Sequence, residues 1–186
     1  MLTLRCAQAA DVPLILALIR ELADYEHLLH AVDATEETLG AALFAATPRV
    51  FCDIAEWHDG TASSPAGFAL WFYNFSTFRG RHGIYLEDLY VKPEYRGRGI
   101  GKALLLQLAE RCVREGLTRL EWAVLDWNEP ALRFYKSLGA VAHKDWILHR
   151  VTGETLQTLG RSDRQTSGVS DAGAATTRES PAPPRR

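Results

Sequence analysis

The sequence predicts an α/β domain built on a mixed, mostly antiparallel sheet, and three observations lead to this class. Segments with strand-like patterns alternate with segments of helical periodicity along the body of the chain. Three strand-like segments then follow one another between residues 49 and 91, which predicts antiparallel hairpins. After them come a long helix and another strand, the pattern of a parallel crossover.

The first third of the chain predicts one strand and two helices. Residues 2–7 alternate between apolar and polar side chains, as a half-buried strand does. Apolar residues then recur at helical spacing over residues 12–23, with Asp11 placed to cap this helix. Residues 33–46 predict a second, shorter helix.

The middle of the chain predicts the three successive strands. They cover residues 49–57, 66–75 and 83–91, which are rich in aromatic and β-branched side chains. Residues 58–65, with the sequence "HDGTASSP", predict a turn-rich loop between the first two of these strands.

The last predicted elements alternate between helix and strand. A long helix over residues 101–113 ends near Gly116, because glycine is the usual residue just after a helix. Residues 118–125 predict a strand, residues 128–139 a helix with Asn128 as its cap, and residues 140–151 a final strand.

The C-terminal residues differ in composition from the rest. Residues 160–186 contain one Val and no Leu, Ile or aromatic residue, so they cannot bury enough apolar surface to offset the entropy lost on ordering. We therefore expect one folded domain over residues 1–159 and a disordered tail over residues 160–186.

Composition excludes several functional classes. The chain has 186 residues and a net charge of −2, whereas nucleic-acid binders usually carry a basic surplus. No apolar run approaches the roughly 18 residues of a membrane span, and Arg5 and Asp11 interrupt any signal-peptide pattern. Its three cysteines and six histidines show no metal-ligand spacing. We expect a cytoplasmic protein without a metal that binds neither nucleic acid nor membrane.

The segment "YRGRGIGKALL", residues 95–105, predicts a phosphate site. Glycines let the backbone approach an anion and adopt unusual dihedral angles, a helix start offers unpaired N–H groups, and flanking arginines add positive charge. The P-loop and dinucleotide-binding patterns both fail on spacing. What remains is R-x-x-G-x-G, formed by Arg96, Gly99 and Gly101.

With this loop the sequence resembles the GNAT N-acetyltransferase superfamily. The segments "RELADYE", "YLEDLYV", "WNEPALRFYKSLGA" and the late Trp146 extend the resemblance to its diamine (spermidine/spermine) and thialysine acetyltransferase branch. The resemblance implies the GNAT fold, whose sheet is splayed between strands 4 and 5 and carries helices on both faces. It also implies a homodimer and acetyl-CoA as cosubstrate. The implied cofactor-binding residues are Leu89, Tyr90, Val91, Arg96, Gly97, Arg98, Gly99, Ile100, Gly101, Lys102, Asn128, Glu129, Pro130 and Ala131.

Acetyl transfer to an amine requires a proton acceptor, an oxyanion donor and a proton for the departing thiolate. A lysine-like ammonium has a pKa near 10.4, so neutralising it near pH 7.4 costs about 4 kcal/mol. Strand alternation sends Glu87 and Asp88 to opposite faces, and the resemblance selects Glu87 as the residue that contacts the amine, with Asp88 structural. It also implies that the N–H near Leu89 polarises the thioester carbonyl and that Tyr135 is the acid.

The same resemblance implies an acidic acceptor site for a small cationic amine. Its implied substrate-binding residues are Tyr25, Glu26, Glu87, Glu121, Trp122 and Ala123. Three alternatives stay open at this point. The acceptor could be a protein N-terminus or lysine, or the amine of an antibiotic, or the domain could sense coenzyme A without turnover.

Overall fold

The computed structural model describes residues 1–60 and 62–166 and confirms the predicted α/β class. Its sheet has the order β1-β2-β3-β4-β5, with neighbours antiparallel except for the parallel pair β4 and β5. The strands are β1 Leu2–Cys6, β2 Phe51–Asp59, β3 Ala62–Ser76, β4 Arg81–Val91 and β5 Leu120–Trp122. The helices are α1 Val12–Tyr25, α2 Glu36–Leu43, α3 Ile100–Arg114, α4 Glu129–Ser137 and α5 Gly153–Thr166, with short 3₁₀ turns η1 Ala9–Asp11, η2 Leu29–Ala31 and η3 Pro93–Tyr95.

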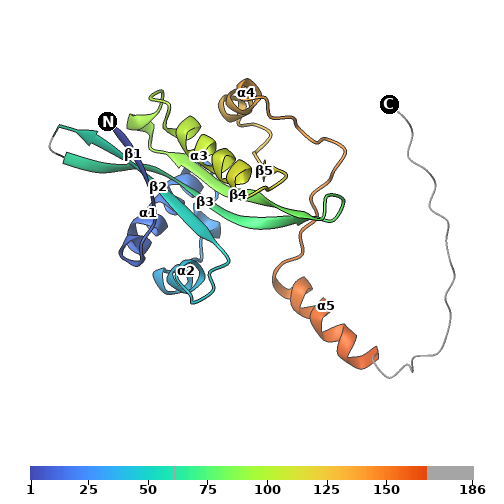
Figure 1. Cartoon of the computed structure of the whole chain (residues 1–186). Coiled ribbons are helices and arrows are strands. Elements are labelled where there is room, and N and C mark those ends of the chain that lie inside the picture. Colours follow the sequence, from blue (N-terminus) through green and yellow to red (C-terminus); the bar gives the residue numbers. More distant parts are fainter. Residues whose placement is uncertain (61, 167–186) are drawn as a thin grey trace, which may run out of the picture. The chain divides into compact units, whose positions relative to one another are not determined.

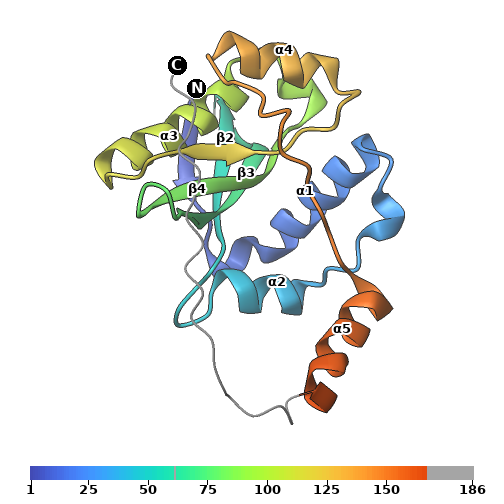
Figure 2. The same ribbon diagram turned by 90° about the vertical axis from the view of Figure 1, so that its right-hand side faces the viewer.

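The chain divides into two compact units, of which the first, Met1–Phe134, contains the whole sheet. Helices α1 and α2 cover one face of the sheet and α3 covers the other (Figures 1 and 2). The main apolar cluster lies under α1 and α2, and its buried members are Ile15, Leu18, Leu43, Cys52, Ile54, Phe68, Leu70 and Tyr90. The second unit begins at Tyr135 and contains α5.

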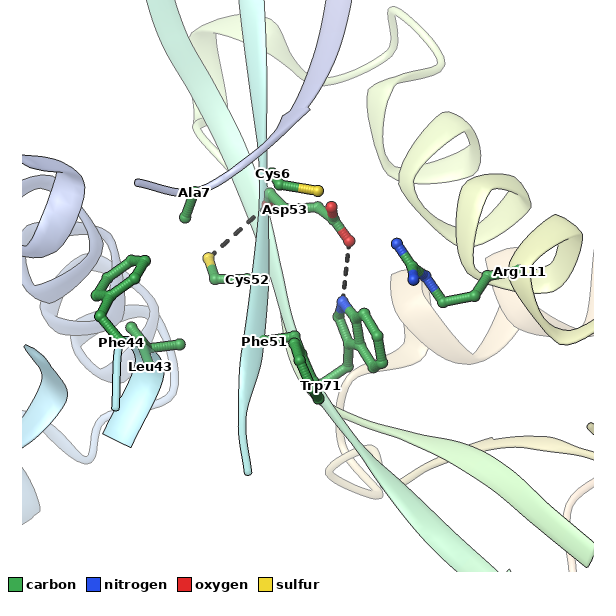
Figure 3. A pocket seen from close by; sticks show the side chains of 9 residues that line it. All are labelled: Cys6, Ala7, Leu43, Phe44, Phe51, Cys52, Asp53, Trp71 and Arg111. Atoms are coloured by element: carbon green, nitrogen blue, oxygen red, sulfur yellow. Dashed lines mark hydrogen bonds between the residues drawn. The ribbon is translucent and has the colours of Figure 1, made fainter. Parts of the chain in front are cut away.

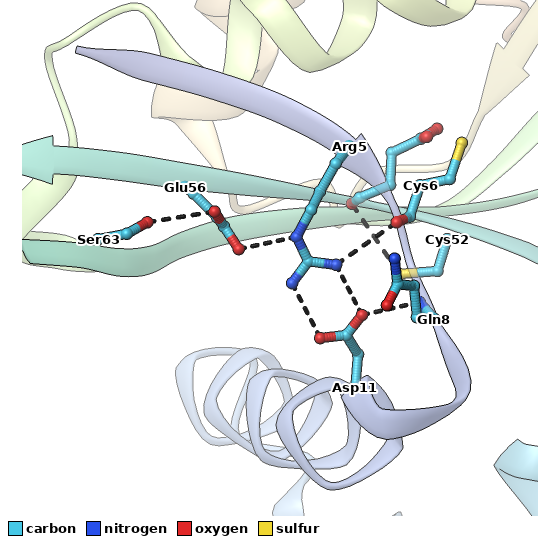
Figure 4. Close-up of polar contacts among 8 residues, drawn as sticks. Arg5, Cys6, Gln8, Asp11, Cys52, Glu56 and Ser63 are labelled. Carbon is cyan, nitrogen blue, oxygen red and sulfur yellow. Dashed lines mark hydrogen bonds and ion pairs between the residues drawn. The ribbon is translucent and has the colours of Figure 1, made fainter.

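An ion-pair network fixes the start of α1 against the sheet (Figure 4). The Arg5 guanidinium donates to both carboxylate oxygens of Asp11, at 2.6 and 2.9 Å, and to Glu56 on β2 at 2.7 Å. Asp11 also accepts the backbone N–H of Gln8 at 2.7 Å. Asp11 is the N-cap residue of α1, as predicted, but its side chain makes no capping hydrogen bond, because the carboxylate is directed to Arg5 and the preceding turn instead.

Two predicted boundaries in the first unit differ from the structure. Residues 58–59 and 62–65 are strand rather than loop, because β2 and β3 pair almost to the turn at Gly60, where φ is +68°. The strand expected over residues 118–125 is reduced to β5, which pairs with β4 only from Leu120 to Trp122.

The second unit departs further from expectation. Residues 140–151 form no strand in the described part of the chain, since β-structure requires a paired neighbour and none is assigned to them. The boundary expected after residue 159 falls inside α5, so residues 160–166 are helical rather than disordered. The remainder of the expected tail, residues 167–186, lies outside the described residues.

We expect Asp11→Asn to lower the free energy of unfolding by about 2 kcal/mol at pH 7, because it removes a charged, largely buried partner of Arg5. The Arg5 hydrogen bond holds the pKa of Asp11 below its ordinary value. The stabilisation is therefore complete above that ordinary value and is lost as pH falls through the lowered one. Urea titrations at pH 7 and pH 3 measure this, with the exposed Asp33→Asn as control. A difference between wild type and Asp11→Asn that is equal at both pH values would contradict the assignment.

Candidate active site

The glycine loop ends in a helix start that is open to an anion. Gly97 and Gly99 take left-handed conformations with φ of +75° and +79°, which other residues rarely adopt. Gly99 is the N-cap of α3, and its carbonyl accepts the N–H of Ala103 at 2.9 Å. No side chain caps this helix end, so its first N–H groups are available to a ligand oxygen.

The third glycine of the motif lies where the start of α3 packs on its neighbours. A Cβ at Gly101 would meet Val91 at 3.7 Å and the ring of Phe134 at 3.9 Å. Ile100 beside it is buried. The start of α3 thus packs against the end of β4, and a methyl group at Gly101 would be in ordinary contact with both neighbours.

Both loop arginines lie on aromatic rings. The Arg96 guanidinium lies 4.9 Å from the centre of the Tyr25 ring, and its Nε donates to the carbonyl of Val91 at 2.9 Å. The Arg98 guanidinium lies 4.9 Å from the ring of Trp57. These contacts leave the positive charges beside the helix start while restricting their side chains.

Strand β4 carries one extra residue at the predicted acidic pair. Trp71 of β3 pairs with Leu86, and the adjacent Leu70 pairs with Asp88, so Glu87 has no counterpart on β3. Such a β-bulge interrupts strict alternation. The strict alternation from which opposite faces were predicted for Glu87 and Asp88 therefore does not hold at this point of β4. Asp88 shares the sheet face of its register partner Leu70, which belongs to the apolar cluster under α1.

The bulge coincides with an opening in the sheet. Strand β5 pairs with β4 at Ile84, Tyr85 and Leu86 and no further. Beyond Leu86, the edge of β4 that faces β5 has no strand partner among the described residues. This is the splay between the fourth and fifth strands that the sequence resemblance implied, and Leu89, Tyr90 and Val91 lie along it.

Carboxyl groups gather on the α1 side of this opening. Burial raises the pKa of Glu26, the C-cap residue that follows α1. Burial also raises the pKa of Asp88 to about 7, and the neighbouring charges of Glu87 and Glu26 add to the shift. Glu87 itself is exposed. The structure thus brings the predicted Glu26 and Glu87 together with Asp88, a residue expected to be structural.

Tyr25 connects the acceptor side to the predicted pantetheine side. Its hydroxyl is 3.3 Å from Oδ1 of Asn128, and its ring is 6.1 Å from that of Trp127. Asn128 Oδ1 also accepts the backbone N–H of Ala131 at 3.3 Å, which confirms Asn128 as the cap of α4. Glu129 and Pro130 form the exposed first turn of that helix.

The remaining predicted residues are less closely tied to this region. The Glu121 carboxylate is held by Arg119 at 2.9 Å and by the amide of Asn74 at 2.6 Å. Trp122 ends β5, and Ala123 follows it exposed. Lys102 is exposed in the first turn of α3. Tyr135 lies on α4 at the beginning of the second unit, and its role stays a prediction.

Sequence reasoning missed a pocket at the start of β2, with a volume of about 200 Å³ (Figure 3). The buried Asp53 carboxylate accepts the indole N–H of Trp71 there at 2.9 Å, and Arg111 lies 4.9 Å from the ring of Trp71. Its lining residues come from β1, α2, β2, β3 and α3. No local motif could reveal it, because these residues are distant in the sequence.

The described residues offer neither a metal site nor a membrane-spanning helix. Within residues 1–60 and 62–166, no group of three His, Cys, Asp or Glu side chains is placed to hold a metal ion. No helix in the same part of the chain is long and apolar enough to cross a membrane. The cysteines Cys6, Cys52 and Cys112 are free thiols.

Comparisons with known proteins agree with the motif. A family model described as "Acetyltransferase (GNAT) family" matches residues 16–140. The chain is 43% identical to the thialysine N-epsilon-acetyltransferase of Bos taurus, over 84% of this chain and 95% of that protein. It is 34% identical to an L-ornithine N5-acetyltransferase of Arabidopsis thaliana, over 85% and 87% of the two chains. Among solved structures, an aminoglycoside acetyltransferase from a soil metagenome shares the fold, with a TM-score of 0.68 at 18% identity over 82% of this chain and 97% of that one.

We expect Gly99→Asp to weaken coenzyme A binding at least 10-fold, because a carboxylate at the N-cap of α3 would repel a diphosphate. Gly99→Asn is the matched control, since asparagine has the same size, tolerates the left-handed conformation and adds no charge. Isothermal titration calorimetry with coenzyme A compares the two variants. Equal affinities for the aspartate and asparagine variants would exclude the α3 start as the phosphate site.

Proposed function

The chain belongs to the acetyltransferase (GNAT) family, and from this premise we propose that it moves the acetyl group of acetyl-CoA directly to a primary amine of a small di- or polyamine or a lysine-like molecule. The main observation that supports the proposal is what lies along β4 and at its end. At the bulge this strand holds carboxyl groups, and at its end it leads into a helix start open to an anion. One strand therefore joins a place for an ammonium group to a place for a diphosphate.

The proposed cofactor contacts follow the loop and β4. The N–H groups from Arg96 to Lys102 bind the diphosphate, and Leu89, Tyr90 and Val91 line the acetyl and pantetheine end along the unpaired edge of β4. Asn128 to Ala131 contact the pantetheine arm. Acetyl-CoA is a cosubstrate here, and no metal is required for the reaction.

The proposed chemistry needs no acyl-enzyme. The ammonium group of the acceptor binds beside Glu87 and loses a proton, and its nitrogen then attacks the thioester carbonyl. The backbone N–H near Leu89 stabilises the oxyanion. When the C–S bond breaks, Tyr135 gives a proton to the departing sulfur and recovers one from the acylated nitrogen.

The acceptor is proposed from the charges of the site and the names of the relatives. Glu26, Glu87 and Asp88 make an acidic surface that suits a cation, with Tyr25 and the segment Glu121–Ala123 around it. Relatives are named thialysine N-epsilon-acetyltransferase, L-ornithine N5-acetyltransferase and spermidine/spermine N(1)-acetyltransferase-like protein 1, and the compounds in these names are small amines. A second ammonium group on such a molecule would pair with Glu26.

The proposal also covers the extent of the domain, the oligomeric state and the cellular location of the protein. We propose that residues 1–159 form the acetyltransferase domain, that the protein is a homodimer and that it works in the cytoplasm. The free state of Cys6, Cys52 and Cys112 supports a reducing compartment. The homodimer rests on family resemblance alone.

An acceptor panel with purified protein and acetyl-CoA tests the proposed function. It contains thialysine, ornithine, lysine, putrescine, spermidine and spermine, alongside peptides with free N-termini or lysines and an aminoglycoside. We expect turnover with at least one small di- or polyamine or lysine-like amine, at a kcat/KM at least 10-fold above that of any peptide. Turnover of peptides or the aminoglycoside alone would refute the acceptor class, and coenzyme A binding without any turnover would indicate a sensor.

Tyr135→Phe should reduce kcat roughly 100-fold while leaving the affinity for acetyl-CoA unchanged, because it removes only the proton donor. Tyr73→Phe removes one hydroxyl, which donates to Glu115 at 2.7 Å, and serves as the matched control. Steady-state kinetics with the best acceptor measures both. An unchanged kcat in Tyr135→Phe, under conditions where acetyl transfer limits the rate, would remove Tyr135 from the mechanism.

A further inference from the structure

We propose that the Asp88 carboxylate finally takes up the proton that the ammonium group of the amine substrate loses before its nitrogen attacks the thioester. This inference rests on the proposed function and deepens it. Glu87 then holds the ammonium group at the exposed side of the bulge, and Asp88 behind it takes the proton.

The first support is the position of Asp88 in the bulge. Because Glu87 is the extra residue, Asp88 takes the face of Leu70, toward the end of α1 where Glu26 lies. It is also next to Leu89, the residue whose N–H is proposed to bind the thioester oxygen. A carboxylate there lies between the proposed acetyl site and the acidic end of α1.

The second support is that Asp88 is partly buried without a cation. It forms no salt bridge or hydrogen bond within residues 1–60 and 62–166, although isolated buried carboxylates are costly. A structural carboxylate would be expected to accept hydrogen bonds from a neighbouring loop. An amine substrate supplies the missing positive charge.

The surroundings of Asp88 favour uptake of a proton near neutral pH. The charged groups that act on it are Glu87 on its own strand and Glu26 at the end of α1, both acidic. The Cys52 thiol on β2 is neutral, since burial raises its pKa far above its ordinary value. With a pKa of about 7, Asp88 titrates near neutral pH and can both take up and release the proton.

The proton balance of the step is complete. One proton passes from the ammonium nitrogen to Asp88, and the freed lone pair forms the C–N bond. The electrons of the broken C–S bond stay on sulfur, which gains a proton through Tyr135 as the nitrogen loses its second one. Asp88 then releases its proton to solvent, so each turnover yields the amide, the thiol and one H⁺.

The test is the pH dependence of kcat/KM for the amine between pH 5.5 and 9, with thialysine as probe. Wild type should gain activity with an apparent pKa near 7, because Asp88 must be ionised to act. Asp88→Asn should no longer show this rise of kcat/KM with pH (the pH limb), and its kcat/KM at pH 7.5 should be at least 10-fold below that of wild type. Its binding of acetyl-CoA should be unchanged. Glu87→Gln should keep the limb and shift it to lower pH, because one like charge beside Asp88 is gone.

Two controls separate this inference from its premise. Asp88→Asn should keep or raise the melting temperature at pH 8, since it removes an uncompensated charge, and the exposed Glu110→Gln should match wild type throughout. An active wild type whose pH limb survives in Asp88→Asn, or vanishes in Glu87→Gln instead, overturns the role of Asp88 alone. A wild type that acetylates no amine overturns the proposed function and this inference together.

Discussion

The extra residue in β4 is the constraint on which the site depends. By inserting Glu87 opposite no residue of β3, the strand turns Asp88 toward α1, and pairing with β5 stops at Leu86. A bulge bends and twists a strand locally, so one insertion can account for both the gathered carboxyls and the open edge. Without it, alternation would continue along β4 and the acidic pair would be divided between the two faces of the sheet.

The site is also held together by contacts between its two halves. Tyr25, at the end of α1, lies under the Arg96 guanidinium of the glycine loop and reaches Asn128 at the cap of α4. One aromatic side chain thus contacts groups proposed to bind both ends of the cosubstrate and stands beside Glu26.

Sequence reasoning succeeded where a short segment determines its own structure. The left-handed glycines at the start of α3 and the Asn128 cap follow from local chemistry, and both are confirmed. It failed where the pairing of strands determines the structure. Neither the bulge at Glu87 nor the absence of a strand over residues 140–151 produces a recognisable pattern in the amino-acid sequence. The resemblance selected Glu87 and left Asp88 as structural, and only the position of the bulge draws attention to Asp88 as well.

The most direct test of the central claim is a crystal structure of the protein with coenzyme A. The account predicts the diphosphate on the N–H groups at the start of α3 and the thiol end in the opening of β4 beside Leu89. A nucleotide bound elsewhere, such as the pocket lined by Asp53, Trp71 and Arg111, would contradict it.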